Sequence, residues 1–236
     1  VWFAYEGEEW VLRDCSFRVS RGERVAIVGA TGEGKSTIAK LLNRSYDVSR
    51  GRLLLDGVDV REWDLETLRR QVGVILQDVF LFTGTVEANL RLGNGRVSRE
   101  AMARAAELAN ARAFIEALPH GYGEEVRERG ANFSQGQRQL LAIARALVYD
   151  PAVLVLDEAT SSVDPESEAL IQEALSRLLQ GRTSLIIAHR LSTIKMADRI
   201  LVLHKGQVRE QGTHAELLRH GGIYARLYEL QFGGAR

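Results

Sequence analysis

The fold of this chain is decided by the stretch Gly29-Ala30-Thr31-Gly32-Glu33-Gly34-Lys35-Ser36-Thr37. It fits the phosphate-binding pattern G-x-x-x-x-G-K-[ST], and it follows an apolar run over residues 24–28 that is typical of a buried strand. Glycines let backbone N–H groups approach phosphate oxygens, and the helix that follows directs its positive N-terminal end at the same anion. Lys35 can reach the β- and γ-phosphates, and the Ser36 hydroxyl can bind Mg²⁺. An ordinary glycine-rich turn is the alternative, but the strand before the loop and the helix after it favour nucleotide binding.

The composition is that of an ordinary globular domain. Of 236 residues, 45% are apolar and 26% are charged, and 31 basic side chains balance 31 acidic ones. Because the net charge is zero, the chain lacks the basic footprint of nucleic-acid-binding domains, and we expect no nucleic-acid partner. No apolar run reaches the ~18 residues that span a bilayer, and no signal-peptide pattern opens the chain. Taken alone, this composition predicts a soluble, cytosol-type polypeptide.

The hydrophobic pattern predicts an α/β fold with a mainly parallel sheet and an inserted helical subdomain. The core is expected over about 1–83 and 149–236, and the insert, where apolar residues recur at helical spacing, over about 84–148. Cys15, the single cysteine, excludes an internal disulfide and a cysteine metal cluster, and we expect it to be a packed strand thiol. Strands are predicted over 12–19, 24–28, 52–55, 58–60, 72–76, 153–156, 184–188, 200–203 and 208–210, and helices over 35–42, 65–70, 101–109, 111–118, 137–147 and 165–179.

Three polar residues follow two of the predicted buried strands. Asp157 and Glu158 end the apolar run 153–156, and His189 closes the run 184–188. Taken alone, Asp157 and Glu158 would be interpreted as two solvated acids at a strand end, and His189 as a structural hydrogen-bonding residue. Beside a phosphate loop, however, Asp157 is expected to help hold Mg²⁺, and Glu158 is placed to polarise an attacking water. Because parallel strands end at one edge of a sheet, His189 becomes a candidate donor to the γ-phosphate.

A family resemblance enters with the segment Asn132-Phe133-Ser134-Gln135-Gly136-Gln137-Arg138-Gln139, which resembles the L-S-G-G-Q signature of ATP-binding cassette (ABC) ATPases. Gln77, the Asp157-Glu158 pair, the segment Ser161-Ser162-Val163-Asp164 and His189 occur in the expected order around it. Nearly the whole chain therefore resembles one ABC nucleotide-binding domain. The resemblance implies a phosphate-loop core, an N-terminal antiparallel β-subdomain and a helical signature subdomain.

The resemblance also implies roles for individual residues. Tyr5 resembles the aromatic residue that stacks on adenine, although a strand-edge tyrosine is the alternative. Gln77 resembles the glutamine that binds Mg²⁺ and senses the transmembrane partner, and Asp164 resembles the inter-subunit contact of the D-loop. A serine hydroxyl and the N–H groups of a helix start can receive a γ-phosphate across a dimer interface. The resemblance thus implies that the signature residues act on the partner's ATP and not on the chain's own; they are Ser134, Gln135, Gly136 and Gln137.

Three segments resemble exporters in particular. The segment 126–130 resembles the loop that touches the transmembrane coupling helices, with Glu128 and Arg129 as contact residues; as part of a solvated loop neither would attract notice. The segments 78–85 and 222–228 are also similar to those of exporters. Arg127 departs from the family, because a glycine usually precedes the glutamate of this loop.

The second departure from the family is Gln135, which stands where the signature has a glycine and puts a side chain where the backbone approaches phosphate. Such a change resembles heterodimeric exporters, in which one of two ATP sites is weak. This chain's own ATP site keeps Lys35, Asp157, Glu158 and His189, so it is expected to be competent beside a standard partner signature.

The sequence thus predicts the Mg²⁺-dependent ATPase domain of an ABC exporter, at the cytoplasmic face of the membrane. Its expected partners are a second nucleotide-binding domain, different rather than identical, and the transmembrane domains of an exporter. A start directly on the first strand favours a domain excised from a longer chain. One rival, an ABC ATPase acting on DNA or ribosomes, would need insertions, tandem cassettes or basic arms that the sequence lacks. Intact Glu158 and His189 argue against another rival, a regulatory module without hydrolysis.

Overall fold

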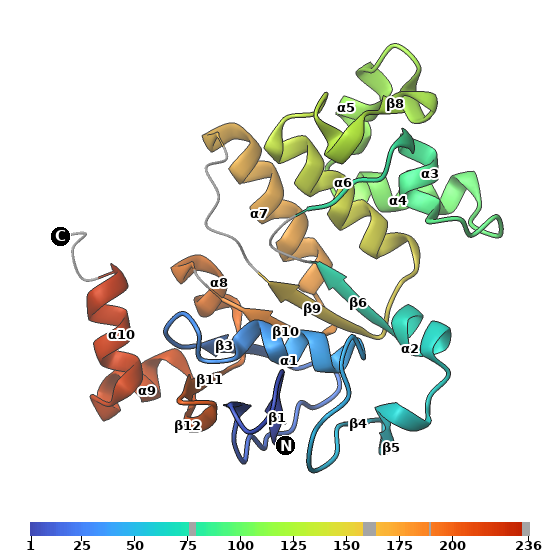
Figure 1. The fold of residues 1–236 in the computed structure, drawn as a ribbon. Helices are drawn as coiled ribbons and strands as arrows, with labels where there is room; N and C mark the ends of the chain where they lie inside the picture. The colour runs from blue at the N-terminus through green and yellow to red at the C-terminus, as the bar shows by residue number, and fades with distance from the viewer. Residues whose placement is uncertain (76–78, 158–163, 189, 233–236) are drawn as a thin grey trace. The chain divides into compact units, whose positions relative to one another are not determined.

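The computed structural model describes residues 1–75, 79–157, 164–188 and 190–232 (Figure 1). The chain forms two compact units. The first comprises Val1–Val74, Ala152–Thr160 and Gly181–Arg236, and the second comprises Ile75–Pro151 and Ser161–Gln180. Among the described residues, no helix combines the length and apolar character that crossing a membrane requires.

A six-stranded sheet with the strand order β12-β11-β3-β10-β9-β6 organises the first unit. β10 pairs in parallel with β3 and β9, and β11 pairs in parallel with β3, whereas β12 joins the edge antiparallel to β11. The predicted mainly parallel sheet is therefore confirmed. The strands are β3 (Arg24–Val28), β6 (Val72–Ile75), β9 (Val153–Asp157), β10 (Thr183–Ile187), β11 (Arg199–His204) and β12 (Gln207–Gly212).

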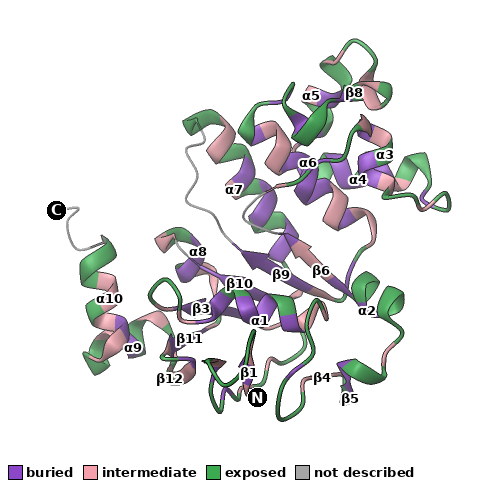
Figure 2. Ribbon diagram, viewed as in Figure 1, coloured by how far each residue is buried: buried purple, intermediate pink, exposed green. Residues whose placement is uncertain are grey.

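The inner strands are apolar along their length because both faces of the sheet are covered. In β3, Val25, Ala26 and Ile27 are all buried, although alternate residues point to opposite faces. Helix α1 (Lys35–Leu42) contributes Ile38 and Leu41 to the core cluster that contains Ile27. Figure 2 shows the resulting continuous burial on β3, β9 and β10.

Short antiparallel pairs accompany the sheet, and one expectation about them was wrong. The Asp56-Gly57 turn, with φ of 50° and 82°, joins β4 (Leu54–Leu55) to β5 (Val58–Asp59), and the two strands lie within the predicted ranges 52–55 and 58–60. The strand predicted over 12–19, however, ends at Leu12, because β2 (Trp10–Leu12) pairs only with β1 (Phe3–Ala4). Asp14 adopts a positive φ of 43°, which strands do not tolerate, so Cys15 is buried outside any strand.

The second unit is helical, with one antiparallel pair, β7 (Gly84–Thr85) and β8 (Glu125–Val126). The helix over Gln135–Val148 buries all of residues 140–144 and Leu147, so most of its circumference is covered by its neighbours. The helices are α3 (Val86–Arg91), α4 (Arg99–Leu108), α5 (Arg112–Ala117), α6 (Gln135–Val148) and α7 (Pro165–Leu179), with 3₁₀ turns η2 (Gly121–Gly123) and η3 (Glu128–Gly130).

The remaining helices belong to the first unit. They are η1 (Val60–Glu62), α2 (Leu65–Gln71), α8 (Leu191–Met196), α9 (His214–His220) and α10 (Ile223–Phe232). The sequence prediction places no helix after residue 210, so α9 and α10 are additions of the structure. α9 begins at a capping box of Thr213 and Glu216 and ends at Gly221. α10 is anchored by Glu210, whose carboxylate accepts the backbone N–H groups of Ile223 and Tyr224.

The buried thiol of Cys15 gives a direct test of the packing. Burial raises its pKa to about 11, so the reactive thiolate is scarce in the folded chain near pH 8. We expect 5,5′-dithiobis(2-nitrobenzoate) to react slowly at pH 8, and rapidly once urea unfolds the chain. The folded chain holds the thiol proton more tightly than the unfolded chain does. We therefore expect the contribution of Cys15 to the free energy of unfolding to be constant below about pH 9 and to fall as the pH rises from about 9 to 11. Fast, stoichiometric reaction of the folded chain would contradict the buried placement.

Candidate functional site

The phosphate loop connects β3 to α1, and its glycines serve the backbone geometry. Gly32 and Gly34 have φ of 85° and 94°, in the left-handed region that side chains disfavour. A Cβ atom on Gly29 would lie 2.4 Å from the carbonyl oxygen of Leu203, and one on Gly34 would lie 2.8 Å from a methyl group of Leu12. The loop is thus packed tightly against β11 and β2, and its conformation requires glycine at these positions.

Lys35, the first residue of α1, is only 6% exposed. Its ammonium group donates to the carbonyl oxygens of Gly29 and Ala30, at 2.9 and 2.8 Å. Burial lowers the pKa of Lys35, while the carboxylates of Asp157 and Glu33 act in the opposite direction. An ammonium has three N–H donors, and the two carbonyls take two of them. The loop therefore holds a desolvated cation, suited to interact strongly with phosphate oxygens.

Asp157 ends β9 at the same edge of the sheet. It stands opposite Ile187 of β10, which in turn stands opposite Ile27 of β3, so the carboxyl ends of all three strands lie side by side. Within the described part of the chain, its buried Oδ1 atom has no hydrogen-bond partner. An unpaired buried carboxylate oxygen beside a phosphate loop fits a hard cation such as Mg²⁺. Ser36, the other predicted ligand in this unit, lies exposed in the first turn of α1.

The described residues contain no cluster of three or more His, Cys, Asp and Glu that would hold a metal by itself. Mg²⁺ typically takes one or two protein ligands and completes its coordination with substrate phosphates and water. Asp157 and the Ser36 hydroxyl are compatible with that mode.

Tyr5 follows β1 and lies over α1. Its hydroxyl is 3.0 Å from the Thr37 hydroxyl and 3.4 Å from the Lys40 ammonium, which also lies 5.3 Å from the ring centroid. Phe3 and Tyr46 contact the ring edge-on, with centroids 4.9 and 5.1 Å away. Tyr5 remains 43% exposed, so solvent and a planar ligand can still reach it beside these contacts. Sequence reasoning missed Lys40 and Tyr46, because no local pattern links them to Tyr5.

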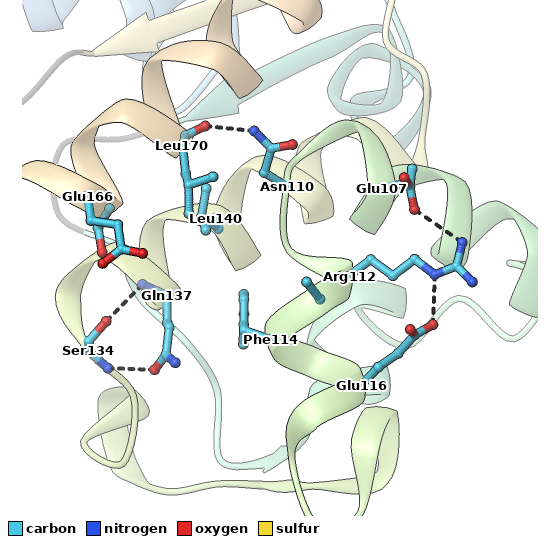
Figure 3. Close-up of a pocket in the computed structure, with 12 residues that line it drawn as sticks. Glu107, Asn110, Arg112, Phe114, Glu116, Ser134, Gln137, Leu140, Glu166 and Leu170 are labelled. Carbon is cyan, nitrogen blue, oxygen red and sulfur yellow. Dashed lines mark hydrogen bonds and ion pairs between the residues drawn. The ribbon is translucent and has the colours of Figure 1, made fainter.

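The signature residues start helix α6. Ser134 is its N-cap and forms a capping box with Gln137: the Gln137 N–H donates to Ser134 Oγ at 3.1 Å, and the Ser134 N–H donates to Gln137 Oε1 at 2.9 Å (Figure 3). Gln135 is the first helical residue and is exposed, whereas Gly136 is buried.

A pocket of about 660 Å³ opens beside Ser134 and Gln137 in the second unit (Figure 3). Arg112 lies in it between two carboxylates, Glu107 at 3.1 Å and Glu116 at 2.7 Å. Asn110 donates to the Leu170 carbonyl oxygen at 3.0 Å and so ties the α4–α5 junction to α7. Sequence reasoning missed this pocket, because its walls come from four helices. The lining residues are Glu107, Asn110, Arg112, Ala113, Phe114, Glu116, Ser134, Gln137, Leu140, Glu166, Ser167 and Leu170.

Other predicted residues lie elsewhere in the second unit. Asp164 is the N-cap of α7 and accepts the backbone N–H of Ser167 at 2.8 Å, and this hydrogen bonding lowers its pKa. Glu128 and Arg129 are exposed in η3, where Arg129 has a positive φ of 54°. Gln77, Glu158 and His189, together with residues 161–163 of the D-loop, lie outside the described residues.

Comparison with known proteins identifies the family. The family model described as "ABC transporter" matches residues 12–161, which include the phosphate loop, the signature and Asp157. The chain belongs to the ABC transporter family. It is an ATP-binding domain of the ATPase type that these transporters contain. The predicted resemblance of the chain to an ABC nucleotide-binding domain is thereby confirmed.

The relatives of this chain are longer proteins. An ABC transporter ATP-binding protein (exp8) of Streptococcus pneumoniae is 48% identical over 99% of this chain and 40% of its own length. An ATP-dependent lipid A-core flippase of Vibrio vulnificus is 52% identical over 98% of this chain and 40% of its own length. The solved structure of a bacterial Atm1-family ABC exporter with ATP bound matches with a TM-score of 0.90 and 44% identity, over 98% of this chain and 41% of that one. The chain thus spans about two fifths of the relatives it matches.

The capping box of α6 carries a measurable share of stability. We expect Ser134→Ala to lower the free energy of unfolding by about 1 kcal/mol, because the Gln137 N–H loses its acceptor. Urea denaturation measures the change. Ser176→Ala, at an exposed position inside α7, is the matched control and should shift the free energy by less than about 0.5 kcal/mol. Equal midpoints for the two variants would show that the cap contributes nothing.

Proposed function

We propose that this chain binds and hydrolyses ATP to drive export across a membrane, as one of two ATP-binding domains of an ABC exporter. The observation that carries the proposal is the buried Lys35 ammonium. It donates to the carbonyl oxygens of Gly29 and Ala30, and the negative charge of Asp157 is close enough to act on its pKa. The similarity to a lipid A-core flippase and to an ATP-bound exporter structure supports export over other ABC functions.

The chain's own residues divide the work of binding and hydrolysis. The N–H groups of the loop and the Lys35 ammonium bind the β- and γ-phosphates, and the ring of Tyr5 stacks on the base. Ser36 and Asp157 would hold Mg²⁺, with Gln77 as a further ligand from the sequence prediction. When bound, Mg²⁺ supplies positive charge that neutralises the phosphate oxygens. In this proposal Glu158 accepts a proton from the attacking water, and His189 donates a hydrogen bond to the γ-phosphate.

The signature of this chain acts on a second domain. Ser134 and Gln137 form the N-terminal turn of α6, where the helix dipole and the first N–H groups favour an anion. Two such domains would therefore enclose two ATP molecules between them, each bound by one phosphate loop and the opposite signature. Asp164, the predicted contact residue of the D-loop, would contact the partner domain in the same closed state.

Gln135 makes the two ATP sites unequal in this proposal. It is exposed at the first position of α6, so its side chain stands at the helix end that would face the partner's γ-phosphate. A glycine there would leave the backbone bare for close approach. The partner of this chain is therefore a different domain with a standard signature, and the site served by Gln135 is the weak one.

The remaining partner is a pair of transmembrane domains. The matched relatives are more than twice as long as this chain, and one of them is described as an ATP-binding and permease protein. Glu128 and Arg129, exposed in η3, would contact the coupling helices, with Arg127 altering that contact. The domain would lie at the cytoplasmic face of the membrane, where ATP is available.

Removing the proposed general base should separate binding from turnover. In a chain that carries Gln135→Gly to permit dimerisation, we expect Glu158→Gln to lower ATP turnover by at least about 100-fold and to change the ATP dissociation constant by less than about threefold, since the amide cannot accept the proton. Phosphate release and equilibrium ATP binding measure the two effects. Turnover equal to that of the chain with Gln135→Gly alone would remove Glu158 from the mechanism.

The asymmetry of the dimer can be weighed directly. With ATP and Mg²⁺, the Glu158→Gln chain should remain largely monomeric in light scattering, because both of its sites would use the Gln135 signature. Adding Gln135→Gly to that chain should produce an ATP-dependent dimer, and Gln135→Ala is the matched control for a short side chain. A tight, fully active homodimer of the chain with Gln135 in place would overturn the heterodimer proposal.

A further inference from the structure

One side chain of the phosphate loop contacts a segment far away in the sequence. Glu33 contacts the turn between β11 and β12: its Oε2 atom accepts the backbone N–H of Lys205, and its Oε1 atom lies 3.2 Å from Nδ1 of His204. Lys205 follows Glu33 by 172 residues in the sequence, and His204 directly precedes Lys205. The Glu33 side chain is only 14% exposed, whereas that of His204 is 40% exposed, so the carboxylate is largely enclosed by this contact.

A carboxylate in this loop needs hydrogen-bond donors or positive charge beside it. The loop binds a polyanion, and the negative charge of Glu33 is close enough to act on the Lys35 ammonium. An unpaired carboxylate would repel phosphate and would lose free energy through its own burial. The Lys205 N–H and the His204 ring satisfy it on the far side of the loop.

The same hairpin supports the loop at a second point. The carbonyl of Leu203 packs against Gly29, where even a Cβ atom would lie 2.4 Å from its oxygen. The turn itself is locked in place, because a Cβ atom on Gly206 would lie 2.3 Å from the carbonyl oxygen of Val11, and the Arg13 N–H donates to the Gly206 oxygen at 2.9 Å. Gly29 and Glu33 therefore attach the beginning and the later part of the loop to one rigid hairpin.

Glu33 lies between Gly32 and Gly34, the two loop residues in the left-handed region. Glycine loses more backbone freedom on ordering than any other residue, so this part of the loop is the part that most needs a restraint. A restraint that is present before the ligand arrives lowers the entropic cost of binding.

We propose that Glu33 is a positioning residue, which pre-orders the phosphate loop for ATP by fastening it to the β11–β12 turn through the Lys205 N–H and His204. This inference rests on the proposed function, because it concerns the same ATP site. It adds a part of the chain, the turn 204–206, that none of the loop motifs includes.

The test compares two substitutions that separate the hydrogen bond from the charge. Glu33→Ala removes both, and we expect ATP with Mg²⁺ to bind on the order of fivefold to tenfold more weakly. Glu33→Gln keeps an acceptor for the Lys205 N–H and should recover most of the lost affinity. Hydrogen exchange of the Lys205 amide, followed by NMR, should be faster in Glu33→Ala and remain slow in Glu33→Gln.

Controls keep the outcomes distinct. Glu62→Ala, at an exposed position of η1 in the same unit, should bind ATP like the unmodified chain. Lys35→Ala should lose ATP binding; if the unmodified chain itself bound no ATP, the proposed function would fail rather than the role of Glu33. The role of Glu33 is overturned if Glu33→Ala binds ATP as well as Glu62→Ala does, or if both Glu33 variants bind more tightly, which would make the charge the dominant effect. Unchanged exchange of the Lys205 amide in Glu33→Ala would overturn it as well.

Discussion

The buried ammonium group of Lys35 is the interaction on which the rest of the site depends. A cation that is 6% exposed has lost most of its hydration, and the carbonyl oxygens of Gly29 and Ala30, together with the negative charges of Asp157 and Glu33, offset part of that loss. Its two carbonyl acceptors, Gly29 and Ala30, belong to the beginning of the same loop. The position of the ammonium group therefore depends on the conformation of the loop. Asp157 contributes from the neighbouring part of the sheet, which makes the strand order β3-β10-β9 part of the electrostatics.

That arrangement constrains the packing around it. The loop lies so close to β11 and β2 that a single methyl group on Gly29 or Gly34 would collide with its neighbours. This close packing requires β11 to keep its register beside β3, and it requires the β11–β12 turn to keep its position against the loop. The antiparallel pair β1 and β2, which looks peripheral, supports the turn through Val11 and brings Tyr5 over α1.

The signature segment at the start of α6 is organised differently from the phosphate loop. Its polar groups are organised within one helical turn, by the capping box of Ser134 and Gln137, and their environment is a pocket lined by four helices. The half-site is thus locally ordered and still presents exposed groups at the N-terminus of α6. Such a half-site is consistent with a role in a composite site, which is completed only when another domain supplies the nucleotide.

The sequence by itself determined what depends on neighbours in the chain. A buried strand, a glycine loop and a helix start over 24–42 can be read from periodicity and residue type, and the amphipathic pattern over 165–179 predicts α7 with the bounds that the structure gives it. Only the tertiary structure decided what depends on residues far apart: the early end of β2 at Leu12, the cluster around Tyr5, and the contact of Glu33 with Lys205. These contacts have no local signature, because they arise from hydrogen bonds and packing between segments that the sheet topology brings together.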